Sequence, residues 1–280
     1  MKTIILTGGT GYLGRHLSSA LETKGYHVLC LRRAFSDEQA ESLFTHQPVF
    51  AVIHLATCYG RNGESMAELT EGNLLFPLKV LHLAIKHKVK AFLNTDTILT
   101  RFLNPYALSK AQFAEWLKLS ADNITAVNIR LDHFYGPFDT PNKFIAFLFK
   151  SFRENVPELN LTEGAQTRDF TYIDDVVNAY LSILKHSDEF PRGKVTAFEV
   201  GTNRKTSIKD LVQLVQRTCG NTATRLNFGA VAYRKNEQLD YEIDTTALKA
   251  LGWQARVSLQ DGLNKIAQEE KITEFNKEKK

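Results

Sequence analysis

Three side chains near the middle of the sequence could do chemistry on a carbonyl group. Tyr106 and Lys110 stand four positions apart, so a helix would place the phenol and the ammonium one turn apart on the same face. A free tyrosine has a pKa of about 10, and a neighbouring cation lowers that pKa by favouring the phenolate. Thr95, at the end of the preceding apolar run, could hydrogen-bond the oxygen that Tyr106 would protonate. The Tyr–Lys spacing also arises by chance, and the alternative is an ordinary pair on a helix surface.

A glycine-rich stretch near the N-terminus could hold a dinucleotide. Residues 7–14 read Thr-Gly-Gly-Thr-Gly-Tyr-Leu-Gly, directly after an apolar run and before a helical pattern. Glycines at this spacing allow a tight turn and a close backbone approach to a pyrophosphate, while the helix N-terminus offers amide groups to the phosphates. The expected cofactor contacts are Gly8, Thr10, Gly11, Tyr12, Leu13 and Gly14. The alternative is a glycine-rich turn without a ligand.

Two arginines follow the second expected strand, where the adenosine ribose of a dinucleotide would lie. Enzymes that use NAD usually place an acidic residue there to hold the 2′-hydroxyl. This chain has Arg32 and Arg33, and a guanidinium suits the 2′-phosphate of NADP by its charge and its bidentate fork. We therefore expect NADPH as the cofactor. NADH or NAD stays open, because Asp37 follows closely and the arginines could simply be solvated.

These groups need a scaffold, and the apolar periodicity predicts an α/β fold. Short β-branched runs alternate with amphipathic stretches, which is the pattern of strand–helix–strand units around a parallel sheet. We expect strands at 3–7, 27–32, 51–56, 91–95 and 126–131, and helices at 12–24, 72–87 and 106–121. After residue 131 the pattern is irregular, including the aromatic segment 144–152, until a helix at 173–185, a strand at 196–201 and a strand near Val231.

The expected architecture is a Rossmann-type, doubly wound parallel sheet with a small discontinuous C-terminal substrate lobe. Residues 1–133 and 173–201 would form the NADP-binding domain, and residues 134–172 and 202–280 the substrate-binding lobe.

The composition excludes several other classes of protein. The chain has 280 residues and a net charge of +4, an excess too small to indicate nucleic-acid binding by itself. Its three cysteines are an odd number without the spacing of a metal site, which favours a reducing compartment. The residues after Met1 and Lys2 show neither an apolar signal core nor a cleavage site, and no apolar run approaches the roughly 20 residues of a membrane helix. We expect a cytoplasmic protein with no membrane partner and no metal.

The glycine motif, Thr95, Tyr106 and Lys110 occur in the order and at about the spacing of the extended short-chain dehydrogenase/reductase family, which the whole chain resembles. Further matching motifs are His54-Leu55-Ala56, Asn73, Tyr135-Gly136-Pro137, the block from Arg168 to Asp175, and Leu251-Gly252-Trp253. The resemblance implies that Leu55, Ala56 and Asn73 contact the cofactor and that Lys110 also holds the nicotinamide ribose. It implies that Arg168 and Arg234 hold the diphosphate of a nucleotide sugar, although both could be surface pairs. His54 is expected in the core.

The chain departs from two branches of this family. Sugar 4,6-dehydratases carry Thr-Asp-Glu where this chain has Thr95-Asp96-Thr97, and threonine cannot act as the base that removes water. The 4-epimerases keep NAD tightly bound and usually have a longer C-terminal lobe. Reduction is therefore the favoured reaction.

A closer similarity is to the nucleotide-sugar 4-ketoreductases of the CDP-paratose and CDP-abequose synthase type. It is carried by residues 58–62, 131–136, 138–144 and 161–168, on loops at the carboxyl ends of strands. The residues expected to contact the substrate are Tyr59, Arg61, Asp96, His133, Lys143, Arg168 and Arg234. For His133 the alternative is a buried loop histidine whose ring is satisfied by the backbone.

The sequence thus predicts NADPH-dependent reduction of the 4-keto group of a nucleotide-activated deoxysugar in O-antigen biosynthesis. A CDP-4-keto-3,6-dideoxyhexose is the first expectation and a GDP-4-keto-6-deoxy sugar the next. The base, the sugar and the face of C4 that receives hydride stay open. The alternatives are an NAD-dependent nucleotide-sugar 4-epimerase and a non-catalytic NADP-binding sensor. A homodimer through the helices at 72–87 and 106–121 is also possible.

Overall fold

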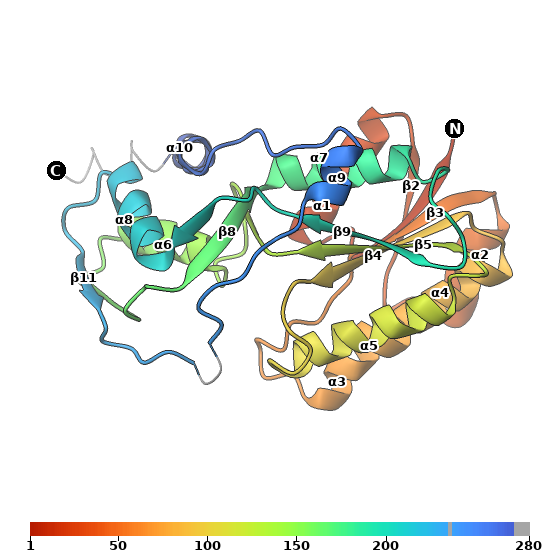
Figure 1. Ribbon diagram of the computed structural model, residues 1–280, viewed down its shortest axis with the longest axis horizontal. Helices are drawn as coiled ribbons and strands as arrows, with labels where there is room; N and C mark the ends of the chain where they lie inside the picture. The colour runs from red at the N-terminus through yellow and green to blue at the C-terminus, as the bar shows by residue number, and fades with distance from the viewer. Residues whose placement is uncertain (235–236, 272–280) are drawn as a thin grey trace. The chain divides into compact units, whose positions relative to one another are not determined.

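The computed structural model of the chain describes residues 1–234 and 237–271, and it divides into two compact units. The first unit holds residues 1–132, 177–200 and 244–253, and the second holds 133–176, 201–243 and 254–280 as far as the chain is described (Figure 1). None of the helices in the described ranges has the length and apolar character of a membrane span.

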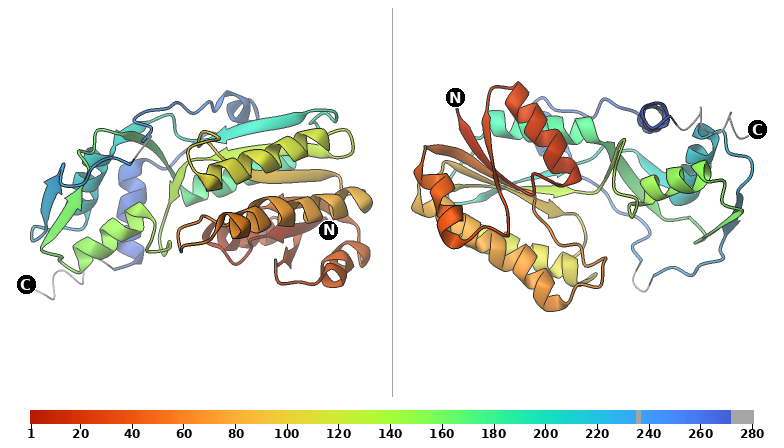
Figure 2. Two further views of the ribbon diagram at one scale, coloured as in Figure 1. Left: turned by 90° about the horizontal axis from the view of Figure 1, so that it is seen from below. Right: turned by 180° about the vertical axis from the view of Figure 1, so that it is seen from behind.

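A six-stranded parallel sheet forms the centre of the first unit (Figure 2). Its strands are β1 (Thr3–Thr7), β2 (His27–Leu31), β3 (Val49–His54), β4 (Ala91–Thr97), β5 (Thr125–Leu131) and β9 (Val195–Val200). They are arranged in the order β2-β1-β3-β4-β5-β9. The order reverses between β1 and β3, which is where an open α/β sheet binds its ligands, beyond the carboxyl ends of the strands.

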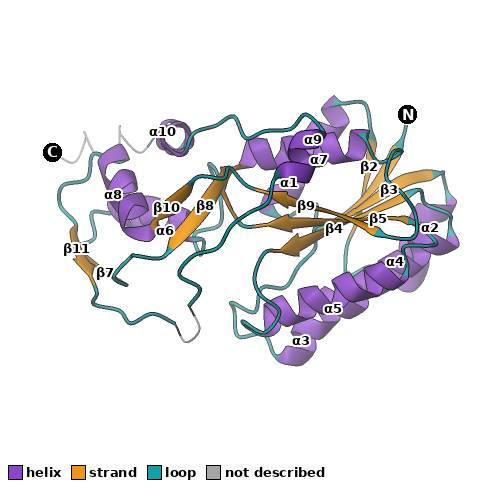
Figure 3. Cartoon of the chain, viewed as in Figure 1, coloured by secondary structure: helices purple, strands orange, loops and turns teal. Residues whose placement is uncertain are grey.

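Helices cover both faces of this sheet (Figure 3). They are α1 (Tyr12–Thr23), α2 (Asp37–Thr45), α3 (Met66–Thr70), the π-helix η1 (Glu71–Leu75), α4 (Phe76–Lys86), α5 (Pro105–Leu119), the part of α7 (Ile173–Lys185) from residue 177, and α9 (Thr246–Ala250). The doubly wound Rossmann-type fold expected from the sequence is confirmed.

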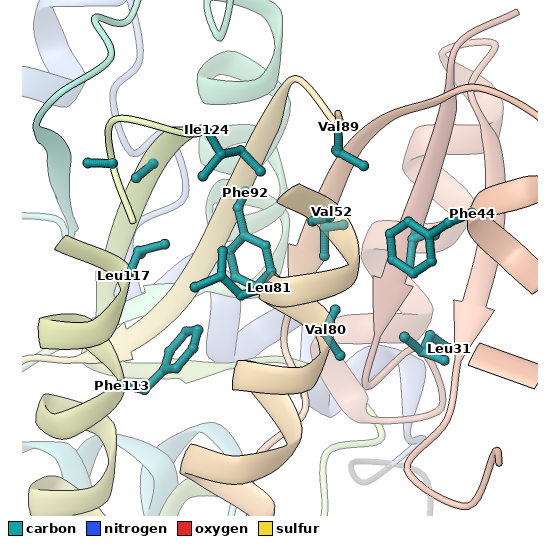
Figure 4. Close-up of a cluster of buried hydrophobic side chains, with 14 residues drawn as sticks. Leu31, Phe44, Val52, Val80, Leu81, Val89, Phe92, Phe113, Leu117 and Ile124 are labelled. Carbon is teal, nitrogen blue, oxygen red and sulfur yellow. The ribbon is translucent and has the colours of Figure 1, made fainter. Parts of the chain in front are cut away.

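An apolar cluster fixes α4 and α5 on the sheet (Figure 4). Leu81 of α4 and Phe113 and Leu117 of α5 pack with Phe92 of β4, and all four are at most 2% exposed. Fully burying one such side chain stabilises the fold by about 1.5–3 kcal/mol. The cluster therefore holds the start of α5, with Tyr106 and Lys110, at a fixed place beside β4.

Two helical features of the first unit differ from the expectations. The helix expected at 72–87 contains the wide π turn η1 before α4 begins. Helix α2 lies between two expected strands, in a segment for which no helix bounds were predicted; it begins at Asp37, after a capping box in which Ser36 accepts a hydrogen bond from the Gln39 amide. Asp37 is the acidic residue that left NAD as an alternative cofactor. It is the first residue of α2, and its carboxylate lies 3.4 Å from the Lys79 ammonium.

As far as it is described, the second unit contains two small sheets, three complete helices and the first turn of α7. Its strands are β6 (His133–Tyr135), β7 (Glu158–Leu161), β8 (Thr167–Tyr172), β10 (Lys205–Ser207) and β11 (Arg225–Phe228), and its helices are α6 (Phe144–Arg153), α8 (Ile208–Thr218) and α10 (Leu259–Glu269). One sheet has the order β10-β8-β6, and the other is the parallel pair β11-β7.

Two expectations for this part of the chain differ in detail from the structure. The strand expected near Val231 is formed by residues 225–228, because these pair with β7; Val231 only donates its amide to the Leu161 carbonyl at 3.1 Å. The aromatic segment at 144–152, expected to be irregular, is helix α6, which buries Leu148, Phe149 and Phe152.

Two segments cross the expected domain boundaries. Residues 173–176 were expected in the NADP-binding domain but lie in the second unit, and residues 244–253 were expected in the substrate lobe but lie in the first unit. The amide of Asp244 donates to the Glu199 carboxylate at 2.8 Å, and the Ser182 hydroxyl donates to the Leu251 carbonyl at 3.3 Å. Helix α9 thereby packs beside β9. The end of the expected 202–280 segment lies outside the described residues.

Candidate functional site

The glycine loop between β1 and α1 is packed so closely that side chains would not fit. Gly8 has a φ of +71°, and a Cβ there would lie 2.7 Å from the Ala56 nitrogen. A Cβ on Gly14 would lie 2.1 Å from the Gly8 carbonyl oxygen. The Gly11 amide closes the turn by donating to the same oxygen at 2.9 Å. The loop therefore brings α1 directly onto the chain that follows β3.

The N-terminus of α1 has the features of an anion site. Its N-cap is Gly11, which makes no side-chain capping hydrogen bond. The first amides of an α-helix have no acceptor within the helix, and the helix dipole makes this end electropositive. Thr10 is exposed and accepts a hydrogen bond from Arg15 through its carbonyl at 2.9 Å, whereas Leu13 is buried. The backbone here fits a pyrophosphate group.

The two arginines after β2 are exposed and make no ion pair with any described residue. The Arg33 guanidinium lies over the π-helix η1, because a Cβ on Gly72 would be 2.7 Å from its Nη1 atom. Gly72 thus leaves the space that Arg33 occupies. This places a cation near Cys58, in the loop that follows β3.

The end of β3 is tied to β1 by buried polar groups. The Thr7 hydroxyl lies 2.8 Å from the His54 Nδ1 atom and accepts a hydrogen bond from the Ala56 amide at 3.2 Å, while the Leu55 amide donates to the Thr7 carbonyl at 3.2 Å. Burial lowers the pKa of His54 well below its usual value, and the charges of Lys110 and Arg33 add to this effect. His54 is therefore neutral and lies in the core, as expected.

Asn73, expected to contact the cofactor, uses its side chain within the protein. Its Oδ1 atom accepts from the Cys58 amide at 2.7 Å and from the Thr57 hydroxyl at 3.2 Å. Its Nδ2 atom donates to the Cys58 carbonyl at 2.8 Å and to the Ser109 hydroxyl at 3.0 Å. Since an asparagine side chain has four hydrogen-bonding positions, none is left for a ligand. Asn73 instead fixes the loop after β3 onto α5.

Lys110 is a buried cation near the start of α5. Its side chain is 2% exposed and forms no ion pair within the described part of the chain. Burial lowers its pKa, and the Asp96 carboxylate opposes this shift. The ammonium is therefore available to hydroxyl groups of a ligand.

Tyr106 stays protonated in this structure. Burial raises its pKa well above the usual value, and the electrostatic effects of Tyr59 and Asp96 add to the shift, whereas a hydrogen bond with Thr57 opposes it. The sequence predicted that Lys110 lowers the pKa of Tyr106; the net shift in this structure is upward, because the cost of burying a phenolate is larger. A protonated phenol is the form that can donate a proton.

Asp96 is held in place by its neighbours. One carboxylate oxygen accepts from the Thr97 amide at 2.8 Å and the other from the Asn128 side chain at 2.8 Å. Asn128 in turn accepts from the Asn94 side chain at 2.7 Å. Both oxygens of Asp96 thus have protein partners. The carboxylate acts electrostatically on Tyr106 and Lys110, and the expected substrate contact stays a prediction.

Thr95 lies on the opposite face of β4 from Asp96, because successive side chains of a strand point to opposite faces. Its hydroxyl lies 2.6 Å from the hydroxyl of Tyr180 on α7. Tyr180 is 0% exposed. Sequence reasoning missed it, since an aromatic residue in an amphipathic helix is typical of ordinary core.

The loop after β3 brings two expected substrate contacts beside Tyr106. The rings of Tyr59 and Tyr106 have centroids 5.3 Å apart, and the Arg61 guanidinium lies 5.0 Å from the Tyr59 ring centroid. Tyr59 is 41% exposed, so its ring is open to a ligand on one side.

In the second unit, Arg168 lies in a largely buried network. Its guanidinium donates to the Glu237 carboxylate at 2.5 Å and to the carbonyls of Thr167 and Gln238 at 2.7 and 2.9 Å. It also lies 5.5 Å from the ring centroid of Tyr241. Its side chain is only 11% exposed, so it is not part of a surface pair.

The other expected contacts of the second unit lie on its loops and strand ends. His133 is exposed on β6, with its Nδ1 atom 3.4 Å from the Tyr241 hydroxyl, so the alternative of a buried histidine was wrong. Lys143 pairs with Asp139 at 3.1 Å and lies 3.8 Å from the Phe134 ring centroid. Arg234 is exposed, and its carbonyl accepts from the Glu237 amide at 3.0 Å.

A parallel sheet with a glycine loop after its first strand, and a Tyr–Lys pair near the carboxyl end of a central strand, defines a dinucleotide-dependent oxidoreductase. The chain belongs to the NAD dependent epimerase/dehydratase family, whose sequence profile matches residues 4–201. The family expected from the sequence is thus confirmed.

Individual proteins with similar sequences or structures are nucleotide-sugar enzymes by name. The chain is 32% identical over 290 residues to CDP-abequose synthase from Salmonella typhimurium (strain LT2), covering 94% of this chain and 96% of that protein. UDP-glucose 4-epimerase from Thermotoga maritima with UDP-glucose has the same fold, with a TM-score of 0.82, 24% identity, and coverage of 99% and 100%. UDP-glucose 4-epimerase from Thermus thermophilus in complex with NAD gives a TM-score of 0.80, 21% identity, and coverage of 98% and 99%.

Proposed function

We propose that this protein reduces the 4-keto group of a nucleotide-activated deoxysugar with NADPH. The observation that carries the proposal is the placement of Tyr106 and the buried Lys110 one helical turn apart at the start of α5. The similarity to CDP-abequose synthase makes a CDP-4-keto-3,6-dideoxyhexose the first substrate to test, with a GDP-4-keto-6-deoxy sugar next.

The chain offers a fitting place for the dinucleotide. The glycine loop excludes side chains, and the α1 amides face the position of a pyrophosphate. Arg32 and Arg33 would hold the 2′-phosphate, and Lys110 the nicotinamide ribose. When bound, the reduced cofactor supplies a hydride for carbon 4 of the sugar.

Tyr106 would donate its phenolic proton to the sugar oxygen as negative charge develops there. The Lys110 ammonium would stabilise the phenolate that remains, since a nearby opposite charge favours the ionised form. Thr95 would donate a hydrogen bond to the same oxygen. Positioned proton transfer of this kind typically contributes about 10²–10⁴-fold in rate.

The second unit would bind the nucleotide diphosphate through Arg168 and Arg234. Arg168 now pairs with Glu237, so a phosphate oxygen would have to replace that carboxylate as its partner. His133 and Lys143 are proposed as sugar or base contacts of the same unit.

Residue 97 supports reduction over dehydration. The Thr97 hydroxyl accepts a hydrogen bond from the Leu99 amide at 3.2 Å. A threonine side chain has no basic group that could remove a proton from carbon. A 4-epimerase is the second candidate, supported by the fold shared with the UDP-glucose 4-epimerases. A non-catalytic NADP-binding sensor is the third, and the retained Thr95, Tyr106 and Lys110 count against it.

Two further proposals concern the cellular state. We infer a homodimer through α4 and α5, because Trp116 and Leu119 of α5 are 50% and 75% exposed. We also infer a cytoplasmic location, because the nucleotide-sugar substrates and NADPH of the proposed reaction are cytoplasmic metabolites.

The deciding experiment follows the absorbance of NADPH with CDP-, GDP- and dTDP-linked 4-keto sugars, with product identification by NMR. Consumption of NADPH with one CDP-linked substrate, and a single C4 alcohol as product, is expected. NAD retained through purification, with interconversion of C4 epimers, would establish the epimerase instead. Cofactor binding without turnover of any of these substrates would establish the sensor.

A further inference from the structure

The Thr95–Tyr180 hydroxyl pair includes one of the residues proposed to contact the substrate, and cofactor binding does not explain it. The two oxygens are 2.6 Å apart, a short distance for a hydrogen bond between hydroxyls. Tyr180 is 0% exposed, whereas Thr95 is only half-buried at the end of β4. One partner thus faces the interior and the other can still reach a ligand.

The direction of this hydrogen bond follows from the chemistry of the two hydroxyls. A phenol is more acidic than an aliphatic alcohol and is the better donor, while its own oxygen is the poorer acceptor. Burial raises the pKa of Tyr180, so its proton stays on the oxygen. A buried O–H without an acceptor is costly, and Thr95 is the acceptor that the structure shows for it. Tyr180 therefore donates and Thr95 accepts.

This direction determines what Thr95 can do. A threonine hydroxyl has one proton and two lone pairs. If Tyr180 occupies one lone pair, the Thr95 proton must point elsewhere, and the half-buried side is the one open to a ligand. Without the phenol, the Thr95 hydroxyl could rotate and donate its hydrogen bond to another acceptor.

We propose that Tyr180 is a positioning residue that holds the Thr95 hydroxyl as a hydrogen-bond donor toward the carbonyl oxygen being reduced. The proposal rests on the proposed function, in which Thr95 contacts that oxygen. Tyr180 itself need not touch substrate or cofactor.

A double-mutant cycle tests this role. Tyr180→Phe removes one oxygen and keeps the ring, and it is expected to lower kcat by roughly three- to tenfold, the size of one neutral hydrogen bond. In a Thr95→Val background the same change should have no effect, because the group that Tyr180 orients is gone. NADPH affinity, measured by fluorescence titration, should be the same in all four proteins.

Two further variants make the comparison decisive. Tyr26→Phe removes the same hydroxyl just before β2, away from Thr95, and should leave kcat unchanged. Thr95→Ser keeps a hydroxyl, so Tyr180→Phe should again lower kcat in that background. If Thr95→Val turns over too slowly for steady-state assay, the same comparison is made on single-turnover rates of NADPH oxidation, where much slower reactions are measurable.

An equal fall in kcat in the wild-type and Thr95→Val backgrounds would overturn the proposal, because it would mark a purely structural role for Tyr180. No fall in the wild-type background, or none in the serine background, would also overturn it. Failure of the proposed function is recognised separately, since wild-type protein would then consume no NADPH with any 4-keto substrate, and the role of Tyr180 would fall with it.

Discussion

Substituting Gly14 by alanine gives the sharpest test of the dinucleotide site. The added Cβ would lie 2.1 Å from the Gly8 carbonyl oxygen, and contacts under 3.0 Å are essentially never found. Helix α1 and the loop must therefore separate by nearly 1 Å. Overpacking of this kind costs about 1–3 kcal/mol, and the better helix propensity of alanine offsets about 1 kcal/mol. The net loss of up to about 2 kcal/mol lowers Tm by up to about 8 °C.

The effect on cofactor binding should be larger than the effect on stability. An amide–phosphate hydrogen bond contributes about 1.5–3 kcal/mol, so displacing two amides raises the Kd for NADPH about 100-fold or more. Fluorescence titration with NADPH measures the change in Kd, and thermal unfolding measures the change in Tm.

Gly25→Ala is the matched control. Gly25 has a φ of +81° and nothing within 4 Å of a built Cβ, so alanine there is strained by about 1–2 kcal/mol without a clash. It should destabilise the protein to a similar extent and bind NADPH normally. A wild-type Kd in Gly14→Ala would refute the assignment of this loop to the pyrophosphate.

Three other changes test the remaining parts of the site. Arg33→Ala should raise the Kd for NADPH by about tenfold or more while leaving that for NADH unchanged; equal losses for both cofactors would remove Arg33 from the 2′-phosphate site. Tyr106→Phe should lower kcat at least about a hundredfold with NADPH binding intact, and near-normal turnover would exclude Tyr106 as the proton donor. The pKa of His54 is lowered in the folded protein, so below about pH 6.5 the unfolded chain binds a proton at this residue and the folded protein does not. The free energy of unfolding therefore decreases as the pH falls below about 6.5. In urea unfolding, the free energy of unfolding of His54→Gln should fall less steeply with decreasing pH than that of the wild type, by up to about 1.4 kcal/mol per pH unit. The same pH slope in both proteins would contradict a neutral buried His54.

Local signals explain what the sequence could predict. The glycine loop and the Tyr106–Lys110 spacing are each contained in a few consecutive residues, and β1 and its following helix have strong apolar periodicity. The segment 225–228 was not recognised as a strand because Arg-Leu-Asn-Phe has little β-branched character, and only its parallel partner β7 makes it one.

Contacts between distant segments account for what was missed. Tyr180 reaches Thr95 across 85 positions, and Glu237 reaches Arg168 across 69, without a motif to join them. The direction of the Tyr106 pKa shift was missed for a related reason. A sequence shows which charges are near in the chain, but burial of the phenol depends on the loop that Asn73 fixes above α5.

The π turn of η1 makes this part of the chain unusually sensitive to its length. An α-helix turns by about 100° per residue, and a π turn absorbs one extra residue without shifting the helix on either side. The extra residue lets Asn73 face the loop after β3 while Val80, Leu81 and Ala84 face the sheet. Deleting one residue from 71–75 would restore a continuous α-helix and rotate one of these two faces away from its partner. The number of residues in η1, and not only their types, therefore sets the orientation of Asn73 relative to the apolar face of α4. This segment should tolerate substitutions far better than single-residue deletions.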